Sequence, residues 1–162
     1  MKLLAILCFT MMMLFAHAQD YTMEGMEVKI SKPIQFETGS DKLLTESDAA
    51  ITIIKNYLEA KTYITLMRVE GHTDGSGDPE TSQSLSEKRA LAVCKRLVEM
   101  GIDCKRLIAV GFGGTKPIAI NNTPENKATN RRISFVNAAL RDKMIGGMPA
   151  DGGGVVSGDV CD

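Results

Sequence analysis

The segment Gly71–Ala90, GHTDGSGDPETSQSLSEKRA, joins the end of a β-like run to the start of an amphipathic helix. Its Gly, Ser, Asp and Pro residues favour a turn, so the segment predicts a strand–loop–helix unit. The loop carries Asp74, and the early turns of the helix carry Arg89. A carboxylate binds an ammonium group, and a guanidinium grips a carboxylate through two parallel N–H donors. The unit is therefore suited to binding a zwitterion.

Hydrophobic periodicity on both sides of this unit predicts further strands and helices. Strands are predicted over residues 28–36 (interrupted at Pro33), 63–70, 107–110 and 132–137, and helices over 46–61, 81–100 and 124–130. Strands that alternate with helices in one chain favour an α/β domain in which helices pack against a sheet.

Two separated segments resemble a known family. Gly71–Ala90 and a second segment, NNTPENKATNRRISF over Asn121–Phe135, are similar to the signature and the closing motif of the OmpA-like peptidoglycan-binding domain. This family includes outer-membrane protein A, the peptidoglycan-associated lipoprotein and the flagellar stator protein. The resemblance covers about Val28 to Val136. It implies an α+β sandwich, in which a mixed four-stranded sheet of order β-α-β-α-β-(α)-β packs with helices and carries a ligand groove at the strand ends.

The resemblance also implies a ligand and residue roles. The ligand is the peptide stem of peptidoglycan, held through diaminopimelate, with its ammonium on Asp74 and its carboxylate on Arg89. Asn130 fixes loop backbone and Arg131 lines the groove. The other candidate ligand-binding residues are Gly39, Thr73, Gly75, Ser76 and Ser82. Departures from the usual family residues occur at Ser82, Asn126, Lys127 and Ser134, which replace Asn, Gly, Arg and Glu.

The same side chains also admit purely structural interpretations. Asp74 is a typical residue for closing its own Asx-turn. Arg89 could be a solvated helix residue or an ion-pair partner of Glu87 or Asp78. His72 is either a packed histidine at a strand end or a wall of the groove. These alternatives are distinguished by the side-chain positions in the fold.

Composition narrows the functional class. The 162 residues allow one domain with a sizeable core, and a net charge of -1 gives no electrostatic case for nucleic acid or an anionic membrane. No residue pattern indicates a cofactor or a metal site, because His72 is the single histidine outside the leader. Cys94 lies on the apolar side of a helix, which is unsuitable for a nucleophile, so the sequence predicts a protein that is not an enzyme.

Four regions are expected along the chain. Residues 1–18 are typical of a secretory signal peptide, with Lys2, an apolar run and the cleavage site Ala16-His17-Ala18. Residues 19–26 are expected to be a flexible N-terminus, 27–138 the peptidoglycan-binding domain and 139–162 a Gly-rich flexible tail outside the fold. The expectation is an exported protein of the periplasm or cell envelope, without a membrane span and with outer-membrane association left open.

The cysteines allow two states in an oxidising compartment. Cys94 and Cys104 are either a disulfide that joins the second helix to the segment after it, or two reduced thiols. Cys161 remains near the expected tail, where it could pair with another molecule.

Three functions are therefore considered. The first is non-covalent binding of peptidoglycan stems, which links the cell wall to the outer membrane or to a partner. The second is an envelope scaffold that uses the tail or Cys161 to join an outer-membrane or other envelope protein. The third and weakest is a cell-wall hydrolase, because no paired carboxylates in a cleft can be identified.

Overall fold

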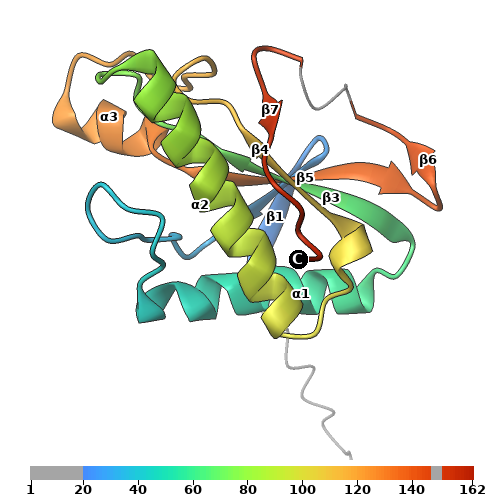
Figure 1. Ribbon diagram of the computed structural model, residues 1–162. Helices are drawn as coiled ribbons and strands as arrows, with labels where there is room; N and C mark the ends of the chain where they lie inside the picture. The colour runs from blue at the N-terminus through green and yellow to red at the C-terminus, as the bar shows by residue number, and fades with distance from the viewer. Residues whose placement is uncertain (1–19, 147–150) are drawn as a thin grey trace, which may run out of the picture.

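A mixed sheet forms the centre of the computed structural model, which describes residues 20–146 and 151–162 (Figure 1). The predicted signal peptide lies outside the described residues. The strands are β1 (Tyr21–Glu24), β2 (Glu27–Ile30), β3 (Ile64–Gly71), β4 (Leu107–Gly111), β5 (Ile133–Leu140), β6 (Lys143–Met144) and β7 (Val155–Val156). The helices are α1 (Asp48–Ala60), α2 (Pro79–Glu99) and α3 (Pro124–Asn130), with short 3-10 turns η1 (Thr45–Ser47) and η2 (Cys104–Arg106).

The strand order is β1-β2-β5-β3-β4-β7, and β6 pairs with β5. β3 and β4 are parallel and joined through α2, whereas the other pairs are antiparallel. The four strands β2-β5-β3-β4 are the predicted mixed sheet, so the fold class is confirmed. The first strand is shorter than predicted, since β2 ends at Ile30 and Phe36 makes only an isolated bridge to Leu43.

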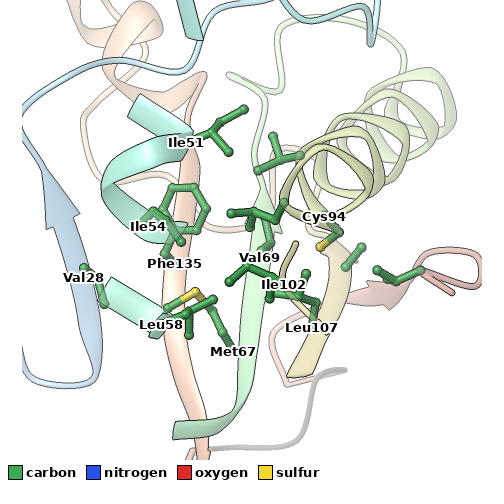
Figure 2. Close-up of a cluster of buried hydrophobic side chains, with 14 of the residues drawn as sticks. Val28, Ile51, Ile54, Leu58, Met67, Val69, Cys94, Ile102, Leu107 and Phe135 are labelled. Atoms are coloured by element: carbon green, nitrogen blue, oxygen red, sulfur yellow. The ribbon is translucent and has the colours of Figure 1, made fainter. Parts of the chain in front are cut away.

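Helices α1 and α2 pack on one face of this sheet and enclose the core. Apolar residues of both helices meet β3 and β5 there, and Figure 2 shows Ile54 and Leu58 of α1 beside Met67 of β3 and Phe135 of β5. Full burial of a large apolar side chain stabilises the fold by roughly 1.5–3 kcal/mol. This core fixes the carboxyl ends of β3 and β4, where the loops that carry the candidate site begin.

Arg68 and Glu70 of β3, together with His72 directly after it, form a buried polar chain on the other face, because successive strand side chains point to opposite sides. The Nε of Arg68 donates to Glu70 at 2.6 Å, and the Nε2 of His72 lies 3.3 Å from the second oxygen of Glu70. His72 is buried and stacks on Phe112 with a centroid distance of 5.3 Å. The interpretation of His72 as a packed histidine is therefore correct.

The two predicted flexible ends are wrong where the structure describes them. β1 pairs with β2, and Tyr21 packs edge-on against Tyr57 of α1 with ring centroids 4.9 Å apart. At the other end, β7 extends the sheet beyond β4, and Val160 joins the core. Figure 1 shows this red C-terminal segment running alongside α2.

The predicted Cys94–Cys104 disulfide is also wrong. Cys104 is bonded to Cys161, 57 residues away in the sequence. Cys94 is a free thiol on the core face of α2, fully buried in the hydrophobic cluster of Figure 2. Burial raises the pKa of the Cys94 thiol. The C-terminal segment brings Cys161 to η2. The ten-residue spacing between Cys94 and Cys104 in the sequence could not reveal this contact.

Candidate functional site

A cavity of about 450 Å³ lies between α2, the start of β5 and the segment that precedes α1. Arg89 and Arg131 line it from one side, and Phe36, Thr38 and Gly39 are among the residues that line it from the other. Gly39 adopts a φ of 69°, a conformation that favours glycine and lets the chain turn beside the cavity. The predicted Arg89, Arg131 and Gly39 are thus brought together at one site.

Arg89 is half-buried and held from two directions. Its Nε donates to the Ser40 carbonyl at 2.9 Å, and its guanidinium lies over the Phe36 ring, 4.9 Å from the centroid. Its terminal nitrogens make no hydrogen bond or ion pair with residues 20–146 or 151–162, so the predicted pairing with Glu87 or Asp78 does not occur. Burial lowers the pKa of Arg89 and nearby Arg131 lowers it further, whereas Asp41 raises it. A fixed, poorly compensated guanidinium suits a carboxylate ligand.

Asp74 is not among the residues that line this cavity; it contacts the lining through the Arg131 guanidinium. One carboxylate oxygen of Asp74 is 2.6 Å from the Arg131 guanidinium, and the other accepts from the Ser76 N–H at 2.9 Å. Burial raises the pKa of Asp74, but the bonds from Ser76 and Arg131 outweigh it and hold the pKa below its usual value. The Asx-turn interpretation is therefore also realised. The Asp74 side chain is 15% exposed, which leaves part of the carboxylate open.

Asn130 is fully buried and organises the loop beside Asp74. Its Oδ1 accepts from the N–H groups of Ile118 and Ala119, and its Nδ2 donates to the Ala119 carbonyl and to Asn121 Oδ1. Asn121 in turn donates to the Asp74 carbonyl. Asn130 does not line the cavity, so it acts on the site through Asn121. Sequence reasoning missed Asn121, although it opens the second family motif.

Thr73 and Gly75 shape the loop instead of facing the cavity. The Thr73 N–H donates to the Gly113 carbonyl, and its Oγ1 accepts from the Gly75 N–H. Gly75 has a φ of 66°, and a Cβ on Gly114 would lie 2.4 Å from the Gly75 Cα. The β3–α2 and β4–α3 loops therefore touch backbone to backbone, which sets the position of Asp74.

Ser82 lies at a different place from the one predicted. It lines a separate cavity of about 590 Å³ with residues that include Gly77, Gln83 and Thr115, and it is absent from the lining shared by Arg89 and Arg131. Ser76 offers its N–H to Asp74 and is likewise absent from that lining. The direct ligand contacts predicted for these two serines are not supported by their positions.

The described residues contain no group of three or more His, Cys, Asp or Glu side chains placed to hold a metal ion. No helix among them has the length and apolar character needed to cross a membrane.

Comparison with known proteins supplies relatives of this chain. A model of the OmpA family matches residues 35–131. The outer-membrane lipoprotein YfiB of Pseudomonas aeruginosa is 35% identical over 113 residues, which cover 70% of this chain and 67% of the relative. Outer membrane porin F of the same organism is 39% identical over 108 residues, but the match covers 65% of this chain and only 30% of the porin.

Two solved structures resemble the fold. The cell wall anchor of the T6SS from Pseudomonas aeruginosa has a TM-score of 0.62 and 26% identity, covering 75% of this chain and 90% of that one. The peptidoglycan-associated lipoprotein from Burkholderia pseudomallei has a TM-score of 0.56 and 28% identity, covering 64% and 86% respectively. Since the family match spans more than half of the 162 residues and agrees with these relatives, the chain belongs to the OmpA family.

Proposed function

We propose that this chain binds the peptide stem of peptidoglycan without covalent chemistry, through the diaminopimelate residue. The carboxylate of the ligand lies on Arg89 and its ammonium on Asp74. The observation that carries this proposal is the Arg89 guanidinium, which is held by Ser40 and Phe36 while its terminal donors make no hydrogen bond or ion pair with a carboxylate of the described residues. The two structural relatives are a cell wall anchor and a peptidoglycan-associated lipoprotein, which supports the same assignment.

The charges of the site favour such a ligand. Two guanidinium groups line the cavity, and the Asp74 carboxylate compensates one of them. A ligand carboxylate would compensate the other, while the ligand ammonium would share Asp74 with Arg131. Each charge-assisted hydrogen bond contributes about 1.5–3 kcal/mol. Binding costs reduce this gain, so we expect a dissociation constant in the micromolar to millimolar range, about -4 to -8 kcal/mol. Weak single-site binding suits a polymer that repeats its ligand.

The proposed place of action is the cell envelope, where the peptidoglycan lies. The named relatives include an outer-membrane lipoprotein and an outer membrane porin, which favours a link between the wall and the outer membrane or a partner there. The scaffold alternative relied on a free tail and a free Cys161. It loses this basis because β7 is paired with β4 and Cys161 is bonded to Cys104.

The test is sedimentation with purified sacculi, using free meso-diaminopimelate as competitor. Arg89→Lys keeps the charge but removes the planar fork, so we expect binding to fall by about tenfold or more. Asp74→Asn should also weaken it. The matched control is Arg96→Lys, because Arg96 is another arginine of α2 that pairs with Asp48 and Glu99 outside the cavity. Unchanged binding and competition in both site variants would refute the assigned roles.

A further inference from the structure

A second cavity adjoins the Arg89 cavity. It has a volume of about 290 Å³ and lies between β2 with the segment after it, the end of α3 and the start of β5. Ile34 and Arg131 line both cavities. The two cavities are therefore neighbours, with the Arg131 side chain at the boundary between them.

The lining of the second cavity is strongly cationic. Lys29, Lys32, Arg131 and Arg132 contribute four positive charges, and Glu27 contributes one negative charge. The Lys29 ammonium is 2.8 Å from the Glu27 carboxylate, and Arg131 is paired with Asp74, which leaves Lys32 and Arg132 as the cations of this lining without an ion pair among the described residues. Lys32 is exposed and makes no ion pair with any described residue. An anionic ligand is the complementary occupant of such a surface.

Arg132 provides a fixed part of this lining. Its two terminal nitrogens donate to the Lys116 carbonyl at 3.3 and 3.2 Å, while its buried Nε has no hydrogen-bond partner within the part of the chain described. Burial lowers the pKa of Arg132, and the nearby Glu27 and Glu70 raise it. Ser134, which is buried, adds a hydroxyl to the same wall. A guanidinium anchored in this way contributes a fixed positive charge to the wall of the cavity before a ligand arrives.

We infer that the second cavity receives a second carboxylate of the stem peptide, on the residue bonded to the diamino acid. This inference rests on the proposed function, since the diamino acid fills the first cavity. A γ-linked glutamyl residue has the required chemistry, because its side-chain carboxyl forms the amide bond and its α-carboxylate remains free. The ligand class is thus a γ-glutamyl-diamino acid dipeptide, and the site distinguishes the free α-carboxylate from its amide.

The test compares three ligands by titration calorimetry. They are meso-diaminopimelate, γ-D-glutamyl-meso-diaminopimelate, and the same dipeptide with the α-carboxylate of its glutamyl residue amidated. We expect the acid dipeptide to bind at least about tenfold more tightly than the amide, since charge-assisted bonds are lost on amidation. Lys32→Gln should weaken the acid dipeptide by about two- to fivefold and leave the amide and free diaminopimelate unchanged. Lys105→Gln, an exposed lysine at the opposite end of β4, is the matched control and should change none of them.

The outcomes separate the two proposals. Equal affinity for the acid and amide dipeptides, with free diaminopimelate still bound, overturns the second carboxylate site and leaves the proposed function standing. No binding of any of the three ligands overturns both. An anionic lipid surface is the competing occupant, so vesicles of phosphatidylglycerol are included. If Lys32→Gln weakens vesicle binding while both dipeptides bind the wild-type chain equally, the second cavity is a lipid-binding surface and the inference is wrong.

Discussion

The Cys104–Cys161 disulfide offers the sharpest quantitative test of the fold. It fastens the C-terminal segment to η2, and that segment is docked by several other contacts. The Ser157 N–H donates to the Ala109 carbonyl at 2.9 Å, and Val160 is 7% exposed within the core. Reduction of the bond should therefore lower the stability of the whole domain.

The magnitude follows from the length of the closed loop. The two cysteines are 57 residues apart, and the loop-closure entropy of a chain of this length stabilises the folded state by about 4 kcal/mol. If the segment detaches locally after reduction, the burial of Val160 is also lost. The loss of this burial costs the folded state about 1.5 kcal/mol or more. The whole free energy of unfolding of a typical domain is about 5–15 kcal/mol, so the loss of the disulfide should remove a large fraction of it.

Urea unfolding with and without reductant measures this difference. The Cys104→Ser/Cys161→Ser double variant is the control, because its midpoint should match the reduced wild type and should not respond to reductant. Cys94 remains reduced in every sample and cannot contribute. Thiol labelling of the oxidised protein after unfolding in urea should find one free cysteine, Cys94, among residues 20–146 and 151–162. A change in the free energy of unfolding below about 0.5 kcal/mol on reduction, or labelling of Cys104 in the oxidised protein, would refute the reasoning.

Two further predictions concern β3. A Cβ on Gly71 would lie 2.1 Å from the Ser86 carbonyl oxygen, so Gly71→Ala should destabilise the fold by about 1–3 kcal/mol or more in urea unfolding, whereas Gly77→Ala, whose nearest contact would be 3.7 Å, should be tolerated. Burial lowers the pKa of His72, helped by Arg132 and opposed by Glu70, so below its ordinary pKa of 6.5 the unfolded chain binds a proton that the folded chain does not. Stability should therefore fall as the pH drops from 6.5, and His72→Gln should flatten that slope; a slope equal to that of the wild type would contradict it.

The sequence predicted the central elements because local signals and tertiary packing agree there. The β-rich run of β3 and the apolar stripe of α2 each bury the residues that their periodicity selects, such as Met67, Val69 and Leu97. Pro124 at the first position of α3 follows Thr123, whose hydroxyl accepts from the Asn126 N–H, as its capping pattern indicated. Such elements can be predicted without knowing which distant residues they contact.

The C-terminal segment was missed because its signal is not local. Val155 and Val156 form only a two-residue strand, and glycines surround them, so no periodicity marks the segment as folded. Its stability comes from the free edge of β4, from the core position of Val160 and from Cys104. The partners on β4 and η2 lie about a third of the chain away, and composition alone indicates a flexible tail.

At the candidate site, too, the sequence indicated the types of the charged residues but not which of them pair with one another. The pattern identified Asp74 and Arg89 as opposite charges at the end of a strand and on the next helix, but it could not show that Arg131 stands between them. Arg131 is fixed by Asp74 and lines both cavities, so it couples the place for the ligand ammonium to the two places for carboxylates. An ammonium that draws Asp74 away from Arg131 would free that guanidinium for a carboxylate in either cavity. On this argument a ligand with both charges binds more tightly than the separate contributions of its ammonium and its carboxylates would indicate.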